Sequence, residues 1–379
     1  MGVLIAPDSF KDSLTALEVS HAIRAGIKAY DASIPCHFLA ASDGGEGFLQ
    51  AIANYKTDVK NIPLTTQDAL GRPLQSHYLY DADQQIAYIE LAKASGLELL
   101  TEQERNPLHT STYGTGLLIK NAIEKGAKTI FIGLGGSATN DGGIGIAEAL
   151  GYQFLDEHGT ILLANGNSLA TIRNIKKSSF FTDEIEIFAI NDVNNPLYGL
   201  QGAAYTYAKQ KGATPQMIEV LDAGLQNLDL QVQKHLGIAN ASIAGSGAAG
   251  GTAYGLASFL NAKFIPGTSF ILELAQFKSL VTKYNISLII TGEGKIDHQT
   301  AFGKFAYGIL QEANTLKIPV LGVCGKLELP PDGIKDLGFL AVSEIFQKDQ
   351  PIQYSFDNAA LLISKVTQQL LEKHGASLF

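Results

Sequence analysis

Five short polar segments of the sequence each follow an apolar run of the kind that forms a buried strand. In open α/β sheets ligands bind beyond the carboxyl ends of the strands, so these segments can meet in one cleft. A carboxylate beside glycine residues in such a place can bind Mg²⁺, accept a proton or hold a hydroxyl group. A single segment of this kind is more often an ordinary loop or helix cap, and only the repetition favours a functional site. The segments are residues 7–11, 42–47, 133–145, 191–196 and 291–297.

The segment 133–145 has the sequence GLGGSATNDGGIG and contains six glycines. A glycine in regular structure costs roughly 0.5–1 kcal/mol of chain entropy, so the cluster indicates positive φ angles or close contact with a ligand, with an ordinary tight turn as the alternative. Residues 133–138 match the dinucleotide pattern G-x-G-x-x-A, and residues 245–250 match G-x-G-x-x-G. The first match does not run into an apolar helix and the second does not follow a strand, which disfavours an NAD site.

Two lysines, Lys11 and Lys304, stand beside expected helix starts. Backbone N–H groups and a lysine together suit a phosphate group at such a place, although a single lysine is usually an exposed surface charge. The sequence contains no P-loop pattern G-x-x-x-x-G-K-[ST] and no zinc-binding spacing. A nucleotide would therefore be held by a different kind of loop.

Apolar runs alternate with helical patterns along most of the chain. Thr15 and Glu18 form the pattern of a capping box, and helices are expected at residues 115–124 and 304–316. Alternation of strands and helices predicts an α/β fold with a mainly parallel sheet. The expected strands are residues 3–6, 36–41, 128–132, 186–190, 286–290, 320–323 and 339–342.

One segment breaks this order, because residues 75–80 and 86–90 predict an antiparallel hairpin. An antiparallel piece within parallel order indicates an inserted domain, which we place at residues 61–284. Residues 1–60 and 285–379 then form the other domain together. A chain of 379 residues agrees with two domains of about 100–200 residues each.

The composition excludes several classes of protein. The net charge of −9 argues against a nucleic-acid or anionic-membrane partner, so an anionic substrate must be bound by local groups. Residues 239–262 carry no charge, but their polar side chains and glycines argue against a membrane helix. Two isolated cysteines, Cys36 and Cys324, favour a reducing compartment, and the N-terminus lacks the pattern of a signal peptide. We therefore expect a cytoplasmic protein that acts on a small molecule.

The sequence resembles a known family, the bacterial glycerate kinases of the type that phosphorylates D-glycerate with ATP. The matching stretches span nearly the whole chain in the family's order, and the glycine-rich segment and the TGEGKIDHQTAFGK block are specific to the family. The chain departs from the pattern at Asn191, where a small or thiol residue is common, and at residues 207–209, which replace a proline-containing stretch. The stretches are IAPDSFKDSLTA (5–16), SDGGEGF (42–48), DALGRP (68–73), IELAKASGL (89–97), STYGTGLLI (111–119), GLGGSATNDGGIG (133–145), DVNNPLYGLQGA (192–203), QKGA (210–213), GSGAAGG (245–251) and TGEGKIDHQTAFGK (291–304).

The resemblance implies a two-domain α/β fold with a discontinuous flavodoxin-like domain, an inserted mixed α/β domain and an active site in the cleft between them. It implies ATP and Mg²⁺ as cofactors, because phosphoryl transfer needs positioning and charge neutralisation more than covalent chemistry. The metal ligands so implied are Asp43, Glu46, Asp141 and Asp297. The phosphate and nucleotide ligands are Gly135, Gly136, Ser137, Gly245, Gly247, Glu293 and Lys304. The substrate ligands are Ser9, Asn140, Asn195 and Arg72, whose two-pronged guanidinium suits a carboxylate.

We predict that Asp192 is the base that takes the proton from the substrate hydroxyl group. Asp192 follows an apolar run and precedes a rigid polar turn, whereas the other acidic residues lie beside glycine runs that suit metal and phosphate. Asp8 is the second candidate, and capping of the loop is the alternative role for Asp192. Lys11 is expected to stabilise the charge of the transferring phosphoryl group.

Two other functions stay open from the sequence. An NAD-dependent hydroxyacid dehydrogenase would explain the G-x-G-x-x-A run, and a non-catalytic two-domain protein that binds a small acid would explain a polar cleft. For a kinase, 2-phosphoglycerate is favoured over 3-phosphoglycerate as the product. The oligomeric state stays open as well, with a homodimer as one option.

Overall fold

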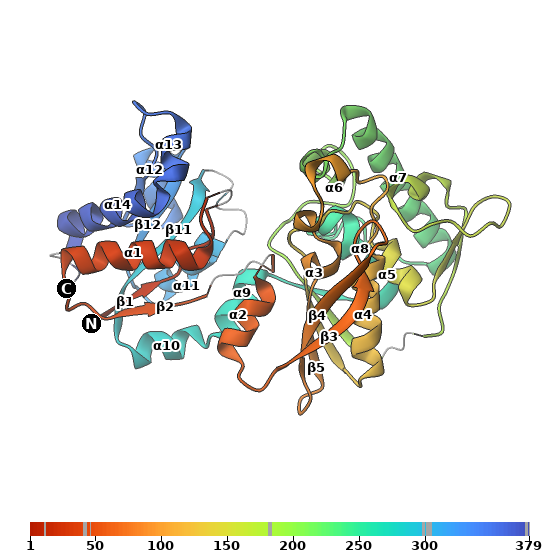
Figure 1. The fold of residues 1–379 in the computed structure, drawn as a ribbon, viewed down its shortest axis with the longest axis horizontal. Helices are drawn as coiled ribbons and strands as arrows, with labels where there is room; N and C mark the ends of the chain where they lie inside the picture. The colour runs from red at the N-terminus through yellow and green to blue at the C-terminus, as the bar shows by residue number, and fades with distance from the viewer. Residues whose placement is uncertain are drawn as a thin grey trace. The chain divides into compact units, whose positions relative to one another are not determined.

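The computed structural model describes residues 1–10, 13–40, 44–45, 47–180, 184–297, 300, 305–375 and 378. Contacts divide the chain into two compact units (Figure 1). Unit 1 consists of Met1–Ser42 and Thr268–Phe379, and unit 2 consists of Asp43–Gly267. Each unit has its own sheet and its own apolar core, so the chain is a two-domain α/β protein.

Unit 1 is built on a five-stranded sheet in which all neighbouring strands are parallel. Its strands are β1 (Gly2–Ile5), β2 (Cys36–Phe38), β11 (Ile286–Ile296), β12 (Val320–Leu327) and β13 (Ala341–Glu344). They lie in the order β2-β1-β11-β12-β13, which is the flavodoxin order when the strands of this unit are numbered along the chain. The order reverses between β1 and β11, and sheets of this kind bind ligands beyond the carboxyl ends of such a pair.

The helices of unit 1 pack on this sheet. The first helix begins at the expected capping box, in which the Thr15 hydroxyl accepts from the Glu18 N–H and the Glu18 carboxylate accepts from the Thr15 N–H. The first and last helices pack side by side (Figure 1), and the core beneath them contains Val3, Ile23 and Ile363. The helices are α1 (Ala16–Tyr30), α9 (Gly267–Leu274), α10 (Phe277–Lys283), α11 (Phe305–Thr315), α12 (Pro331–Leu337), α13 (Ile352–Asp357) and α14 (Ala359–His374).

Unit 2 is built on a six-stranded mixed sheet. In chain order its strands are β3 (Lys60–Gln67), β4 (Pro73–Asp81), β5 (Ile86–Glu90), β6 (Thr129–Gly133), β9 (Glu186–Ile190) and β10 (Lys263–Ile265). The sheet order is β10-β9-β6-β5-β4-β3, and β4 pairs antiparallel with β5, which confirms the predicted hairpin. The strands β5, β6, β9 and β10 are parallel, so their carboxyl ends meet at one edge of the sheet.

Helices and a small second sheet surround the sheet of unit 2. The core contains Tyr78 from β4, Ile132 from β6 and Tyr254 from a helix that follows the Gly245–Gly247 region. The small sheet pairs β7 (Gln153–Leu155) with β8 (Asn174–Lys176). The helices, with 3₁₀ helices written η, are α2 (Phe48–Tyr55), α3 (Ala92–Ser95), η1 (Leu97–Leu99), η2 (Glu102–Glu104), α4 (Tyr113–Glu124), α5 (Ile144–Ala149), η3 (Gly166–Thr171), α6 (Ala203–Tyr207), η4 (Lys209–Lys211), α7 (Pro215–Leu236) and α8 (Ala248–Leu260).

Two strands differ from their predicted lengths. The strand expected at 286–290 continues to Ile296, because its second half pairs with β12 through Thr291–Gly322 and onward to Ile296–Leu327. The prediction that a loop begins at residue 291 is therefore wrong. The strand expected at 36–41 ends at Phe38.

The contacts place the boundaries between the two units after Ser42 and after Gly267, whereas the sequence predicts domain boundaries near residues 60 and 285. The helix α2 packs on β4 and β5 of unit 2, and α10 packs on β11 of unit 1, which accounts for the difference. The folding-domain assignment itself stays a prediction. In the part of the chain that the structure describes, no helix is long and apolar enough to cross a membrane, and the uncharged stretch 239–262 supplies only α8.

Candidate active site

The glycine-rich segment 133–145, here called the glycine loop, connects β6 to α5 at the carboxyl edge of the parallel strands of unit 2. The Gly135 N–H donates to the Gly44 carbonyl at 3.0 Å. The Ala138 N–H donates to the Ser95 carbonyl at 2.8 Å. The glycine loop is thereby fastened to the segment before α2 and to the segment after β5.

The glycine loop needs two of its glycines because the protein's own backbone comes close. A Cβ on Gly135 would lie 2.2 Å from the Cα of Gly45. A Cβ on Gly143, whose φ is +74°, would lie 3.1 Å from the Cα of Gly255. At these positions the neighbour is another segment of the chain and not a ligand. The Gly135 N–H donates to the Gly44 carbonyl. Gly136, by contrast, is exposed, and no described residue accepts a hydrogen bond from its N–H.

Asp141 is fully buried, and its carboxylate binds the surrounding backbone. One oxygen accepts from the Thr112 N–H and hydroxyl, both at 2.8 Å, and from the Gly145 N–H at 3.3 Å. The other oxygen accepts from the Gly143 N–H at 3.1 Å. Burial raises the pKa of the carboxyl group, and the hydrogen bonds from Thr112, Gly143 and Gly145 oppose this change. Asp141 joins the end of the glycine loop to the start of α4, and its metal-binding role stays a prediction.

Lys211 binds the first half of the glycine loop and is not among the site residues that the sequence predicts. Its ammonium group donates to the Ser137 hydroxyl at 2.7 Å and to the Thr139 carbonyl at 2.6 Å. The residue is only 2% exposed, and burial lowers its pKa to about 7, against the opposing effect of Asp141. Its only sequence signal is the QKGA stretch, which gives no indication of burial.

Between these two anchors lie two buried side chains whose polar atoms have no hydrogen-bond partner in the described part of the chain. Thr139 and Asn140 are 0% exposed, and the Thr139 hydroxyl and both polar atoms of the Asn140 amide find no hydrogen-bond partner among the described residues. A buried polar group without a partner costs about 1–3 kcal/mol, so these groups can accept a water molecule or a ligand as partner. Phosphate and hydroxy acids offer the acceptor and donor oxygens that these side chains can bind.

The segment after β9 contains a third such group. The Asn191 side-chain nitrogen is buried and has no partner among the described residues, and the adjacent Asp192 is partly buried. Asn195, which the sequence predicts to bind substrate, uses its side chain for hydrogen bonds within the protein. Its amide accepts from the Tyr207 hydroxyl at 2.6 Å and donates to the Gln201 carbonyl at 2.7 Å.

The second glycine-rich segment packs behind the glycine loop. The Gly247 N–H donates to the Asn195 carbonyl at 2.9 Å. A Cβ on Gly250 would lie 2.1 Å from the Thr139 carbonyl oxygen, so only glycine fits there. A Cβ on Gly245 would lie 3.2 Å from the Asn191 amide oxygen. The structure thus brings the second segment together with Thr139 and Asn191, and the nucleotide roles of Gly245 and Gly247 stay predictions.

Neither dinucleotide-like run has the geometry of a dinucleotide site. The helix α5 begins only at Ile144, well beyond the first run at 133–138. At the second run, three residues that follow the first residue of α8 have positive φ, namely Ala249, Gly250 and Gly251, and the element before α8 is the helix α7. A dinucleotide site needs a helix N-terminus directly after the glycine turn, which neither run supplies.

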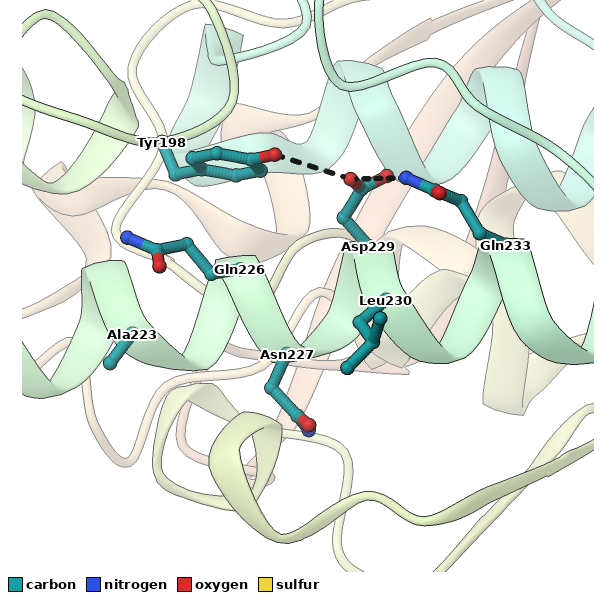
Figure 2. Close-up of a pocket in the computed structure, with 7 residues that line it drawn as sticks. All are labelled: Tyr198, Ala223, Gln226, Asn227, Asp229, Leu230 and Gln233. Carbon is teal, nitrogen blue, oxygen red and sulfur yellow. Dashed lines mark hydrogen bonds between the residues drawn. The ribbon is translucent and has the colours of Figure 1, made fainter.

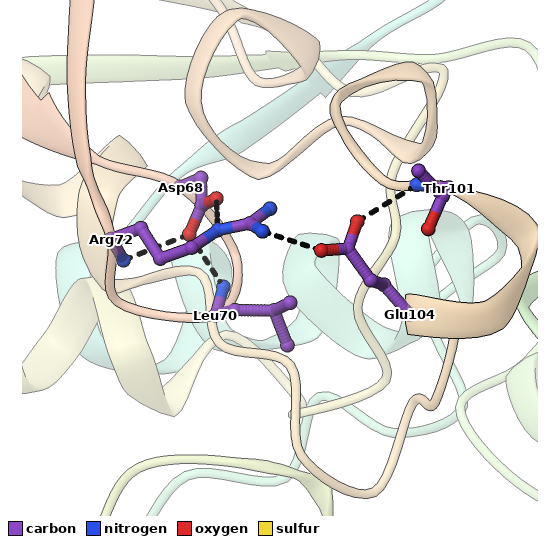
Figure 3. Close-up of polar contacts among 5 residues, drawn as sticks. All are labelled: Asp68, Leu70, Arg72, Thr101 and Glu104. Atoms are coloured by element: carbon purple, nitrogen blue, oxygen red, sulfur yellow. Dashed lines mark hydrogen bonds and ion pairs between the residues drawn. The ribbon is translucent and has the colours of Figure 1, made fainter.

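Arg72, the predicted clamp for a carboxylate, is paired with two carboxylates of the chain (Figure 3). Its guanidinium lies 2.5 Å from Asp68 and 2.5 Å from Glu104. Asp68 also accepts from the Leu70 and Arg72 N–H groups, so the pair closes a tight turn. Ala69 of this turn belongs to a small apolar cluster together with Leu100 and Ala138 of the glycine loop. Arg72 therefore supports a neighbour of the loop, and its role in substrate binding stays a prediction.

The predicted residues of unit 1 lie where β1 and β11 adjoin. The Asp8 N–H donates to the Gly292 carbonyl at 2.8 Å, and the Ser9 N–H donates to the Asp8 carboxylate at 2.7 Å. Glu293 is nearly buried within β11 and accepts from the Thr300 hydroxyl at 2.9 Å. Asp297 lies 3.1 Å from the Lys295 ammonium group. The structure brings Asp8 and Glu293 to the point where the strand order reverses.

Four predicted site residues, Lys11, Asp43, Glu46 and Lys304, lie outside the described residues. Among the residues that are described, no three acidic, histidine or cysteine side chains gather as a metal site. Mg²⁺ in kinases commonly needs only one or two carboxylates together with phosphate oxygens and water. The predicted Mg²⁺ ligands therefore stay a prediction.

A surface pocket of about 470 Å³ lies along α7 and contains none of the predicted site residues (Figure 2). Its one acidic side chain, Asp229, accepts hydrogen bonds from Tyr254 at 3.0 Å and from Gln233 at 2.8 Å. The pocket therefore offers no free charged group. It is lined by Tyr198, Ala223, Gln226, Asn227, Asp229, Leu230 and Gln233.

Comparison with known proteins gives a consistent result over the whole chain. The model of the glycerate kinase family matches residues 3–374. A glycerate kinase of Halalkalibacterium halodurans is 38% identical over 93% of this chain and 93% of that protein. A glycerate 2-kinase of Escherichia coli K12 is 35% identical over 94% of this chain and 95% of that protein. The crystal structure of a candidate glycerate kinase 2 from Salmonella typhimurium LT2 is 34% identical and superposes with a TM-score of 0.77, covering 100% of this chain and 99% of that chain.

Proposed function

This chain belongs to the glycerate kinase family, and we propose that it transfers the γ-phosphoryl group of ATP to a hydroxyl group of D-glycerate. The observation that carries the proposal is the match to curated glycerate kinases over more than nine-tenths of the chain. We favour the 2-hydroxyl group as acceptor, with 2-phosphoglycerate as the product, because one of these relatives is named a glycerate 2-kinase. Membership of a kinase family and the absence of dinucleotide geometry both argue against the dehydrogenase alternative.

The glycine loop is the part of unit 2 that we assign to ligand binding. The hydroxyl of Thr139 and the amide of Asn140 are buried and have no partner among the residues that the structure describes, so they can bind oxygens of the phosphate or of glycerate. In the same loop, the N–H of Gly136 has no acceptor among the described residues. ATP supplies the phosphoryl group, and Mg²⁺ neutralises its charge, which is the main requirement of this reaction. We propose Asp43 and Glu46, in the segment before α2, as Mg²⁺ ligands.

Asp192 remains our choice for the base that accepts the proton of the attacking hydroxyl group. It lies beyond β9 and next to Asn191, whose side-chain nitrogen is without a partner among the described residues. Replacing Asp192 with Asn should lower kcat by about 10²–10⁴ with little change in KM for ATP. A near-normal rate, or a loss of rate that follows a loss of folded protein, would leave Asp8 as the candidate.

The two phosphoglycerates can be distinguished by coupled enzymes. The chain is incubated with D-glycerate, ATP and Mg²⁺, and enolase alone is added to one sample, while a second sample receives enolase and phosphoglycerate mutase. We expect phosphoenolpyruvate in both samples, because enolase accepts only the 2-phospho isomer. Phosphoenolpyruvate in the second sample alone would assign the product as 3-phosphoglycerate. Absence of any phosphorylated glycerate would contradict the proposed function.

The remaining proposals concern the cellular location, the oligomeric state and the small-molecule partner of the enzyme. We propose a cytoplasmic location, in keeping with two free cysteines, Cys36 and Cys324, neither of which is in a disulfide. A homodimer is the oligomeric state that we would test first, by light scattering. Its small-molecule partner is D-glycerate.

A further inference from the structure

The strongest unexplained feature of unit 2 is the buried lysine Lys211. It lies in η4, whose other lysine, Lys209, is exposed. The ammonium group of Lys211 has two acceptors, the Ser137 hydroxyl and the Thr139 carbonyl, and both belong to the glycine loop. No ion pair of Lys211 occurs within the described part of the chain.

The burial of this ammonium group destabilises the fold. Removing a charge from water is expensive unless a partner of opposite charge or good hydrogen bonds offset the loss. Two neutral acceptors do so only in part, because burial lowers the pKa of Lys211 to about 7 even with Asp141 opposing the change. A methionine of similar length would avoid this cost. The lysine therefore needs a reason other than stability.

The contacts of Lys211 supply that reason. The carbonyl of Thr139 belongs to the peptide group that joins Thr139 to Asn140, and this group is planar. A hydrogen bond to the carbonyl therefore fixes the direction of the Asn140 N–H and the course of the chain at its Cα. Asp141 is fixed separately through Thr112, Gly143 and Gly145. Thr139 and Asn140 are thus held from both sides, while the polar atoms of their own side chains have no partner within the described ranges.

We propose that Lys211 is a positioning residue that holds the glycine loop in its ligand-binding shape, at the expense of stability. This inference rests on the proposed kinase function, because it takes Thr139 and Asn140 to be ligand-binding groups. Lys211 acts through the Ser137 hydroxyl and the Thr139 carbonyl and does not itself touch the reacting atoms. Functional sites commonly retain groups that reduce stability for this kind of reason.

The test is the variant Lys211→Met, with Lys209→Met as the matched control. For Lys211→Met we expect kcat/KM with D-glycerate and Mg-ATP to fall by about tenfold to a hundredfold, as for the loss of a group that orients a ligand-binding residue. We expect its melting temperature at neutral pH to equal or exceed that of the wild type, and the rise in melting temperature caused by Mg-ATP to shrink. For Lys209→Met we expect no change in any of these quantities.

A lysine that only supports the fold gives the opposite pattern. Lys211→Met would then melt well below the wild type or fail to fold, and either result overturns the proposal. A folded variant with kcat/KM within about twofold of the wild type also overturns it. The variant Ser137→Ala removes one of the two acceptors, and its effect on kcat/KM should be less than additive with that of Lys211→Met. Inactivity of the wild type would refute the proposed function instead, which separates the two failures.

Discussion

The two units place charged residues near the carboxyl edges of their sheets in opposite ways. In unit 2, Lys211 and Asp141 are buried and bonded to the glycine loop. In unit 1, the half-exposed Lys295 lies 3.1 Å from Asp297 and 2.7 Å from Glu328. In unit 2, Lys211 and Asp141 each form hydrogen bonds mostly with backbone groups. In unit 1, the charged side chains form ion pairs with one another at the surface.

This difference determines which charges control the site. Removal of the Asp141 carboxylate leaves its donors in Thr112, Gly143 and Gly145 buried without an acceptor. The Lys211 ammonium group costs more to bury than its two neutral acceptors return, so it fixes a particular peptide group at the expense of stability. Exposed ion pairs are screened by water and salt and contribute little. The neighbouring lysines Lys295 and Lys326 lower the pKa of Glu328 to about 2, but these groups stay in contact with solvent. Substitutions in the two regions should therefore have very different effects.

The largest effect is expected at Asp141. Asp141→Ala leaves the donors of Thr112, Gly143 and Gly145 buried without an acceptor. We expect a loss of about 3–5 kcal/mol in the free energy of unfolding, measured by denaturation with urea. The variant Asp141→Asn keeps one oxygen for Thr112 and Gly145 and should lose less. If the Asp141→Ala variant were as stable as the wild type, the buried charge of unit 2 would matter no more for stability than the exposed charges of unit 1.

The next effect concerns Lys211 and pH. Its pKa in the folded state is about 7 and lies below the ordinary value of 10.5, so the unfolded chain binds more protons between these values. Stability of the wild type should therefore rise with pH from about 7 toward 10.5, by at most about 1.4 kcal/mol per pH unit through this group. Urea denaturation of the wild type and of Lys211→Met from pH 7 to 9 isolates the contribution. A constant difference between the two proteins would show that the ammonium group is not strained by burial.

The smallest effect is expected at Lys295. Lys295→Ala removes an exposed ion-pairing partner of Asp297 and Glu328, and Glu328 keeps Lys326 at 2.8 Å. We expect a melting temperature within experimental error of the wild type, in low and in high salt. A clear decrease at low salt would mean that the network of unit 1 is structural.

Much of the fold can be predicted because its signals are local. The capping box of Thr15 and Glu18 and the hairpin of β4 and β5 depend on neighbouring residues, and both are confirmed. The continuation of β11 to Ile296 depends on pairing with β12, which is distant in the sequence. A glycine-rich and charged stretch gives no local sign of that pairing.

The candidate site is predicted in location but not in detail. Glycine residues at strand ends predict the place of the glycine loop, but a ligand and another backbone segment both favour glycine, so the residue type does not distinguish them. Gly135 faces Gly45 of the chain itself. The burial of Lys211 depends on packing against the glycine loop, and the partner of Asn195 is the hydroxyl of Tyr207. These are contacts of the tertiary structure, so residue type and spacing do not reveal them.

Two asparagines predicted from the sequence as substrate ligands allow the most direct test of the central claim. Asn195 is satisfied by Tyr207 and Gln201, whereas Asn140 is buried and has no partner for its amide among the described residues. The claim is that unpartnered groups of the glycine loop bind the ligand and that satisfied groups form the scaffold. The variants Asn140→Ala and Asn195→Ala separate the two roles.

The deciding measurement is kcat/KM for D-glycerate and Mg-ATP, together with the melting temperature, for both variants. Asn140→Ala should lose about 10²–10³ in kcat/KM and keep or increase its melting temperature. Asn195→Ala should melt at a lower temperature and keep most of its activity below that temperature. A rate of Asn140→Ala within about twofold of the wild type, or a loss of rate explained by unfolding, would contradict the assignment of the glycine loop as the ligand-binding site.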